Sequence, residues 1–365
     1  MYRAVEFGLA LPETWRAAAD LALELNYFIE HGGNWRPWQP LLQRALARCG
    51  DEDAYLKLRL LDHSGQYFGR DRDWESSLAA HQEEELLARE LGKKDRLAQA
   101  HLNIGIVQWR QRKYEEAAEY TQRALSGFQE VGATERQMGG VLTNLGLIDY
   151  GRGRYTEAIA AHSQAVAHFR KTEFRVLLAR SLVNLALAQE AGGEIGAATS
   201  NYREARAILE DTDYEMDKTR IELSLGALYF NTNRYAEAEE AFLRAYSPYL
   251  KRSGLIYFQG LATNNLGNVY FEQGRIEEAE AILRESLALW KRTDARLQAA
   301  NTTGTLAKVL AAKGQLPEAM SCYDQAVAGA EAFTDDDWAK QILQEFREER
   351  VKLISEQENA GQIEP

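Results

Sequence analysis

Asparagine and arginine side chains recur at a fixed spacing along this chain. One row of polar residues, spaced by 40 or 41 residues, consists of His63, Asn103, Asn144, Asn184, Ser224, Asn265 and Thr305. Four residues before each of these, one turn back on the same face of a helix, stand Arg59, Gln99, Gly140, Arg180, Arg220, Leu261 and Asn301. A side-chain amide both donates and accepts, so an Asn row can bond to an extended peptide backbone whatever side chains that peptide carries. Arginines beside it would favour carboxylates or phosphates, through forked charge-assisted bonds.

We interpret this polar row as a ligand-binding surface. Two asparagines that flank Asn265 extend it, and the candidate residues are Arg59, His63, Gln99, Asn103, Asn144, Arg180, Asn184, Arg220, Asn264, Asn265, Asn268 and Asn301. The alternative is a structural role for Asn near the start of a helix, or simple solvation of an exposed face. Asparagine is a mediocre helix former without a local reason to recur at this period, which favours binding.

Small residues at the same period define the elements that would position this row. They occupy what we call the glycine position, at Gly65, Gly105, Gly146, Ala186, Gly226, Gly267 and Ala307. The steps between them are 40 or 41 residues, a period that marks a repeat array rather than a single-core globule.

Further positions inside each repeat follow the same rule. In the repeat that begins before Gly105, alanine stands at Ala117 and Ala124, and the regular repeats after it have alanine or serine at the equivalent places. A larger residue recurs between these two small ones, as at Thr121 and His162. Small side chains at these spacings let two amphipathic helices approach closely. The repeat at 51–90 departs from the rule, because Glu84 and Glu85 replace the usual Ala-Leu pair.

This pattern of small, large and turn residues resembles the tetratricopeptide repeat (TPR), over roughly residues 13–333. The repeats lack the usual helix-ending proline and are longer than the common 34-residue form. That length resembles the TPRs of kinesin light chain, of Leu-Gly-Asn scaffolds and of the sensor arms of bacterial STAND signalling ATPases. The segment NYFIEHGGNW before LLQRAL is most similar to the last group, although no GxxxxGK[ST] phosphate-binding motif accompanies it.

The resemblance implies an all-α, right-handed α-solenoid of about eight TPR-like helix-turn-helix repeats with a C-terminal capping helix. It also implies that the first helix of each repeat lines a concave groove, where the polar row would lie. We expect an N-terminal helix and an atypical Trp-rich first repeat at 1–50, the TPR array at 51–333, a capping helix at 334–358 and a disordered tail at 359–365. Trp35 and Trp38 in the first repeat belong either to a terminal cap or to a docking surface.

Composition narrows the classes of function. A net charge of −12 disfavours generic binding to nucleic acid or to an anionic membrane. The apolar runs are too short to span a bilayer, and we expect a soluble, cytoplasmic protein. The six histidines show no HExxH spacing, Cys49 and Cys322 lie far apart in sequence, and no motif activates a nucleophile. We therefore expect no enzyme activity, no cofactor and no metal site.

The sequence thus favours a non-enzymatic scaffold or adaptor that binds a protein or peptide ligand, one that carries acidic groups if the arginines contribute. A bacterial signalling complex is one setting that the STAND resemblance implies. The alternative is a peptide-gated regulator whose superhelix changes shape when the ligand binds.

Overall fold

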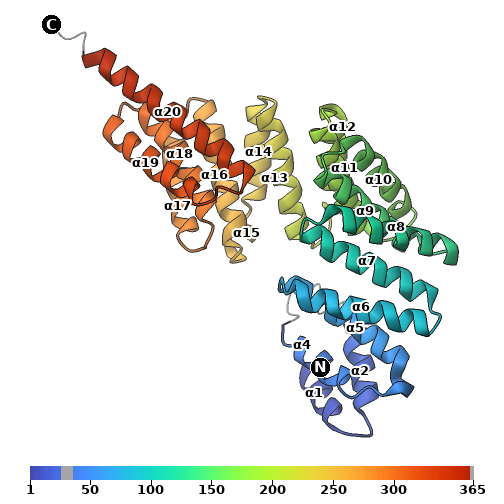
Figure 1. The fold of residues 1–365 in the computed structure, drawn as a ribbon. Coiled ribbons are helices and arrows are strands. Elements are labelled where there is room, and N and C mark those ends of the chain that lie inside the picture. The colour runs from blue at the N-terminus through green and yellow to red at the C-terminus, as the bar shows by residue number, and fades with distance from the viewer. Residues whose placement is uncertain (26–35, 362–365) are drawn as a thin grey trace. The chain divides into compact units, whose positions relative to one another are not determined.

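The structure is a computed structural model that describes residues 1–25 and 36–361. All regular secondary structure in these two ranges is helical (Figure 1). The chain divides into two units, Met1–Glu194 and Ile195–Pro365, which we describe separately. Among the described residues, no helix has the length and apolar character that crossing a membrane requires.

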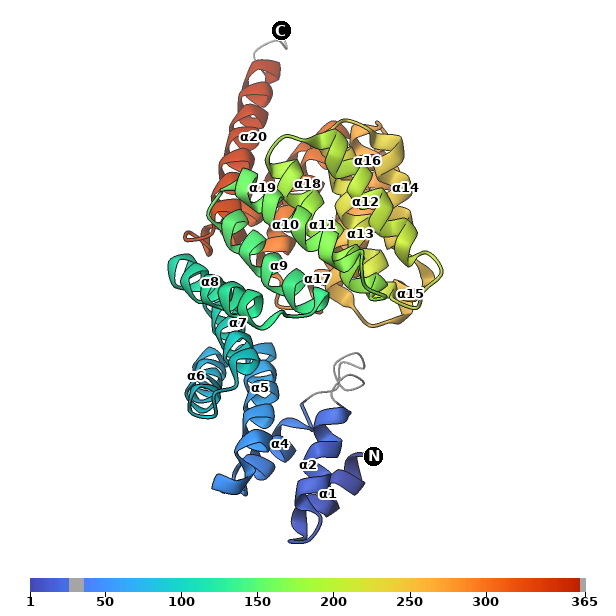
Figure 2. The same cartoon turned by 90° about the vertical axis from the view of Figure 1, so that its right-hand side faces the viewer.

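The first unit consists of successive helix pairs. Its helices are α1 (Tyr2–Ala10), α2 (Trp15–Glu24), α4 (Gln39–Leu46), α5 (Ala54–Arg70), α6 (Trp74–Glu90), α7 (Lys94–Arg110), α8 (Tyr114–Val131), α9 (Glu135–Gly151), α10 (Tyr155–Phe169) and α11 (Arg175–Ala191), with a short 3-10 turn at Asp51–Asp53. Helix α5 packs on α6, α7 on α8, and α9 on α10 (Figure 2). The first helices α5, α7, α9 and α11 also contact one another in succession, so they form one continuous layer.

The second unit repeats this arrangement. Its helices are α12 (Ile195–Leu209), α13 (Glu215–Asn231), α14 (Tyr235–Ala245), α15 (Pro248–Arg252), α16 (Ile256–Glu272), α17 (Ile276–Trp290), α18 (Arg296–Ala312), α19 (Leu316–Glu331) and α20 (Asp337–Gly361). Helices α13, α16 and α18 contact one another in succession, and α20 packs on both α18 and α19. The prediction of an all-α solenoid built from helix-turn-helix repeats is confirmed.

The glycine position is a point of close contact between the two helices of a repeat. A Cβ atom on Gly146 would lie 2.5 Å from the ring of His162, and one on Gly267 would lie 2.5 Å from Leu283. Both distances are far below ordinary van der Waals contact, so only glycine fits opposite these side chains at this helix spacing. The alternation of small and large residues in the sequence therefore reflects how the two helices of a repeat pack against each other.

The turn between the two helices of a repeat requires a left-handed residue. Seven residues after the glycine position, φ is positive at Arg72, Arg112, Gly153, Gly193, Asn233, Gly274 and Gly314. Four of these seven turns use glycine, which adopts this conformation without a steric penalty. Arginine at two of them bears a cost that glycine would remove.

We expect Arg112→Gly to raise the free energy of unfolding by about 0.5–1 kcal/mol, since relief of the left-handed strain exceeds the extra chain entropy of glycine. Denaturant melts of the full chain measure this. The reverse change, Gly153→Arg, should lower stability although no atom lies within 4 Å of where its Cβ would be. An Arg112→Gly protein that is no more stable than wild type would contradict this account of the turn.

The N-terminal end of the array decides between the two interpretations of Trp38. Its side chain is 9% exposed and packs edge-on against Tyr2, with ring centroids 5.5 Å apart, in a core with Leu41 and Leu42. Trp38 is therefore part of the hydrophobic core of the terminal cap, and the docking surface is wrong for it. Trp35 lies outside the described residues.

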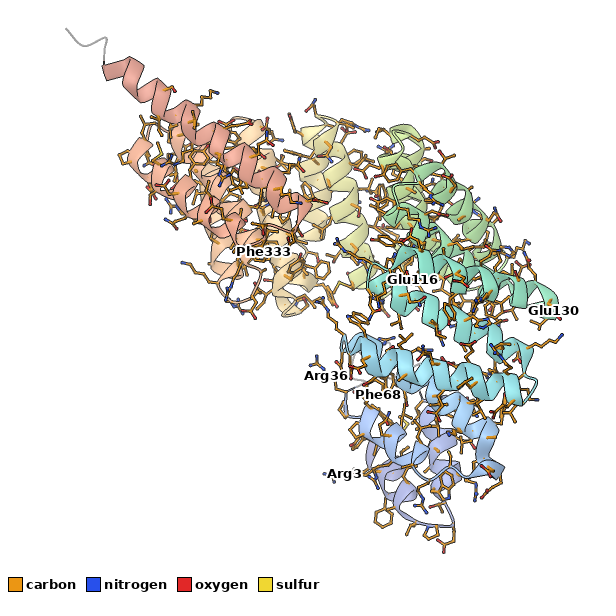
Figure 3. The ribbon with its side chains drawn as sticks, viewed as in Figure 1. Arg3, Arg36, Phe68, Glu116, Glu130 and Phe333 are labelled. Atoms are coloured by element: carbon orange, nitrogen blue, oxygen red, sulfur yellow. The ribbon has the colours of Figure 1, made fainter. Side chains whose placement is uncertain are left out.

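At the other end of the chain, α20 covers the last repeat. Its buried side chains Ala339, Ile342 and Phe346 join the core of α18 and α19. Phe333, in the turn before α20 (Figure 3), packs against this core. The helix runs on to Gly361, and residues 362–365 of the predicted disordered tail lie outside the described part of the chain.

Candidate ligand-binding face

Two asparagines of the predicted row bond to their own chain. Asn103 is 5% exposed, and its Nδ2 donates to Asp62 Oδ1 at 2.9 Å while Gln99 Nε2 donates to its Oδ1 at 3.0 Å. Asn144 is 3% exposed, and its Nδ2 donates to Thr121 Oγ1 at 2.7 Å. Both amides hold neighbouring helices together, so the structure assigns them a structural role in place of the predicted contact with a ligand.

We therefore expect Asn144→Ala to lower the free energy of unfolding by about 1–2 kcal/mol, because it leaves the buried Thr121 hydroxyl without its partner. Asn184→Ala, at the equivalent half-buried position of the next repeat, should change stability by less than about 0.5 kcal/mol. Urea melts of the two variants measure the difference. Equal stabilities would show that the Asn144 bond contributes nothing.

Asn264 is a third structural amide. It is 6% exposed, and its Oδ1 accepts a hydrogen bond of 2.8 Å from Thr302 Oγ1, which in turn accepts one of 2.9 Å from Trp290 Nε1. This chain of bonds links α16, α18 and α17. Asn264 thus belongs to the packing of the second unit rather than to an open surface.

The predicted arginines and His63 differ in their exposure and in their interactions within the chain. Arg59 pairs with Asp20 and Glu24, both at 2.8 Å, and these ion pairs join α5 to α2. Arg180 is exposed but also interacts within the chain. His63 is half-buried, and its Nδ1 has no hydrogen-bond partner among the described residues. Of the three arginines predicted to bind a ligand, Arg59 and Arg180 interact within the chain, and Arg220 is the main candidate that is left.

The remaining candidates of the second unit lie on three adjoining first helices. We call Arg220 on α13, Asn265 and Asn268 on α16, and Asn301 on α18 the amide face. Arg220 is exposed and the three asparagines are half-buried. The side chains of Asn268 and Asn301 make no hydrogen bond to any described residue, and Asn265 accepts only a long bond of 3.4 Å from Asn264. These amides can therefore still donate to and accept from a ligand. Asn184, on α11 of the first unit, is half-buried in the same way.

One aromatic residue on this surface was missed by the sequence analysis. Tyr257 is 42% exposed and lies about two turns before Asn265 on α16, where its ring packs edge-on against Trp290 of α17. Its hydroxyl accepts a hydrogen bond of 3.2 Å from Gln298 on α18. Extending the row by one more step of four residues would have found it.

A hollow of about 620 Å³ lies elsewhere, between α7 and α8, and it is lined by Leu97, His101 and Arg123 among others. Glu130, at the end of α8 (Figure 3), borders it. This carboxylate pairs with Lys94 at the start of α7. No residue of the predicted polar row lines this hollow, so it forms no part of the amide face.

A separate polar cluster is buried in the first unit. Asp62, His81 and Glu84 are 7%, 2% and 0% exposed, and each places one potential ligand atom within 4.8 Å of those of the other two. Burial raises the pKa of Glu84 well above its usual range and lowers the pKa of His81 to about 4. Within the described residues this is the one group of three such side chains that could hold a metal ion.

Fold and surface together define a helical repeat protein with a polar face on its first helices. Models described as "Tetratricopeptide repeat" match residues 65–130, 137–211, 223–247 and 259–332, which together make up more than half of the chain. The chain belongs to the tetratricopeptide repeat family. None of the matching models describes a catalytic domain, and no curated protein matches the chain.

Several solved structures share this fold. A STAND signal transduction ATPase with a tetratricopeptide repeat sensor, from Pyrococcus horikoshii, matches 94% of this chain with a TM-score of 0.73 and 15% identity, and this chain spans 54% of it. The apo quorum sensor NprR from B. thuringiensis matches 92% of this chain and 97% of its own length, with a TM-score of 0.60 and 15% identity. A Rap protein complexed with Competence and Sporulation Factor matches 87% and 92%, with a TM-score of 0.57 and 14% identity. At these identities the likeness shows a shared fold.

Proposed function

We propose that this chain is a TPR adaptor that binds an extended peptide segment of a partner along the amide face. The observation that carries this proposal is the set of open amides on adjoining helices, at Asn265, Asn268 and Asn301, which packing does not use. Each amide can satisfy both the N–H and the C=O of a peptide backbone. The adaptor therefore recognises an extended main chain first and side chains second.

The spacing of the helices suits such a ligand. Packed helix axes are roughly 8–10 Å apart, and an extended chain advances about 3.3–3.6 Å per residue. A peptide that crosses α16 and α18 would therefore meet Asn265 and Asn301 about three residues apart. Two amide contacts of this kind fix the register of a short segment.

Arg220 and Tyr257 add selectivity at the edges of this surface. The exposed guanidinium of Arg220 suits a carboxylate of the ligand. The exposed ring of Tyr257 offers an apolar surface with a polar tip. We infer a preference for segments that carry an acidic residue near the α13 end and an apolar one near the start of α16.

The similar structures support this class of function. One is a Rap protein complexed with a factor, one is a quorum sensor, and one carries its tetratricopeptide repeats as a sensor in a signalling ATPase. On this likeness we propose that the adaptor works in a signalling system, and from the sequence we propose that it does so in the cytoplasm.

Selection from a random library of ten-residue peptides tests the proposal. Peptides that the full chain enriches would be measured by calorimetry against wild type and against Asn265→Ala/Asn301→Ala. Loss of two amide contacts should weaken binding about 10- to 100-fold while helicity stays unchanged. Gln164→Ala/Gln325→Ala removes two exposed amides from second helices and serves as the matched control. Full-strength binding by the Asn265→Ala/Asn301→Ala protein would refute the amide face as the binding site.

A further inference from the structure

The buried cluster of Asp62, His81 and Glu84 lies between the two helices of one repeat. Asp62 is on α5, and His81 and Glu84 are on α6, one turn apart. His81 Nδ1 lies 3.0 Å from Glu84 Oε2, and Asn103 Nδ2 donates to Asp62 Oδ1 at 2.9 Å and to Glu84 Oε2 at 3.4 Å. All of these groups belong to the first unit.

The packing of α5 against α6 does not require an acidic residue at position 84. Glu84 follows Gly65 at the same separation as Ala124 follows Gly105, and the later repeats have Ala165, Ala205, Ala245, Ser286 and Ala326 there. Alanine is thus sufficient for the packing, whereas a buried carboxylate is costly unless a cation or several donors compensate it. Asp62 is partly compensated, since Gln66 Nε2 donates to its Oδ1 at 2.6 Å and Arg96 Nη1 lies 3.8 Å from its Oδ2. Among the described residues, no lysine or arginine forms an ion pair with Glu84.

One atom of the cluster is left without a partner. Glu84 is fully buried, and its Oε1 accepts no hydrogen bond from any described residue. Buried carboxylate oxygens are ordinarily bonded. A fully buried, partly unpaired carboxylate beside a second carboxylate and an imidazole therefore points to a positively charged ligand.

We propose that Asp62, His81 and Glu84 bind one zinc ion between α5 and α6. One imidazole nitrogen and two carboxylate oxygens form a donor set that Zn²⁺ accepts in tetrahedral sites, with a fourth position for water or for a turned Asn103 amide oxygen. Tetrahedral bonds of about 2.0–2.2 Å place ligand atoms roughly 3.4 Å apart. The ligand atoms here lie within 4.8 Å of one another, so small side-chain rotations close the site.

A bound ion would act as a structural staple. It would neutralise both carboxylates and join α5 to α6, while Asn103 extends the contact to α7. Only the repeat at 51–90 carries these side chains, so the staple would stabilise the array locally, next to the N-terminal helices. Such an ion contributes to folding rather than to catalysis.

Zinc binding to the full chain tests this inference. Protein stripped with a chelator would be titrated with zinc chloride by calorimetry and with cobalt(II), whose visible absorption reports tetrahedral coordination. We expect one ion per chain and a melting temperature that rises with zinc concentration. Absence of saturable binding and of any change in melting temperature would overturn the proposal.

Three variants locate the ion. Glu84→Ala introduces the residue of the other repeats, so it should fold, melt at or above the temperature of metal-free wild type, and no longer respond to zinc. Asp62→Asn should bind zinc more than 100-fold more weakly than wild type. Loss of a residue that only hydrogen-bonds to a metal ligand typically weakens binding 10- to 100-fold, and loss of a ligand itself should cost more. Glu222→Gln removes a buried acid of the second unit and should bind zinc as wild type does. Wild-type affinity in Glu84→Ala, or loss of binding in Glu222→Gln, would contradict the assignment.

Discussion

Gly146→Leu is expected to lower the free energy of unfolding by about 3 kcal/mol or more, at the upper end of what overpacking costs. A side chain at this position points at the ring of His162, which is 1% exposed and lies 2.5 Å from where the Cβ would be. Because the ring is enclosed, relief requires α9 and α10 to move apart. Each repeat of a solenoid contacts only its neighbours, so the damage should be greatest in the first unit.

Gly140→Leu on the same helix is the matched control. No atom lies within 4 Å of its Cβ position, so the leucine meets open space. Leucine is also a better helix former than glycine by nearly 1 kcal/mol, and the variant should be as stable as wild type or more so. Circular dichroism melts compare the two variants. Similar melting temperatures would show that the glycine position does not set the helix spacing.

His162 makes the same repeat sensitive to acid. Burial lowers the pKa of its imidazole to about 4, against an unfolded value of 6.5, so the folded chain holds this group neutral. The stability that this provides is fully present above pH 6.5 and is lost as pH falls toward 4. At about 1.36 kcal/mol for each unit of pKa, the loss between pH 7 and pH 4 comes to about 3 kcal/mol.

His162→Leu should remove this part of the pH dependence. Leucine already stands opposite the glycine of another repeat, at Leu283, so it fits the site. We expect the variant to lose about 3 kcal/mol less stability than wild type between pH 7 and pH 4, in urea melts at both pH values. His81 contributes in the same direction in wild type and variant alike, so the comparison isolates His162. Identical acid sensitivity would mean that His162 is already charged in the folded protein.

The repeat architecture could be predicted from the sequence because its determinants are local and recur. Gly146 meets His162 within one helix pair, and the same pairing of small with large appears at Gly226 and Phe242. The turns were less predictable, since Arg72, Arg112 and Asn233 adopt a left-handed conformation for which glycine would be the signal.

The candidate site could be predicted only in part. Whether an asparagine of the row is open to a ligand depends on the side chains that neighbouring helices place next to it. Asn103 is engaged because Asp62 on α5 accepts its hydrogen bond, and Asn144 because Thr121 supplies a hydroxyl from α8. The sequence period groups these asparagines with Asn265, whose surroundings differ. Burial of a polar residue depends on such partners, which spacing alone does not identify.

In the buried polar cluster, the informative residue is one that departs from the repeat pattern. The sequence does mark Glu84 as a break in the alanine position, yet its significance depends on His81 and Asp62 meeting it in space. The sequence predicts no metal site because its histidines and cysteines show no known ligand spacing. The zinc proposal starts instead from a residue that breaks a repeat rule in the core, Glu84 in place of alanine.

The central claim is that open amides on the first helices recognise the backbone of an extended peptide. The most direct test is a series of singly N-methylated versions of a bound peptide, measured by calorimetry against wild type and against Asn265→Ala/Asn301→Ala. If the claim holds, methylation of one or two backbone nitrogens weakens binding to wild type at least about tenfold, as loss of a bond costing about 1–1.5 kcal/mol predicts. The same methylations then have little effect on the double variant. Binding that tolerates methylation at every position, and follows only the peptide's side chains, would contradict the account.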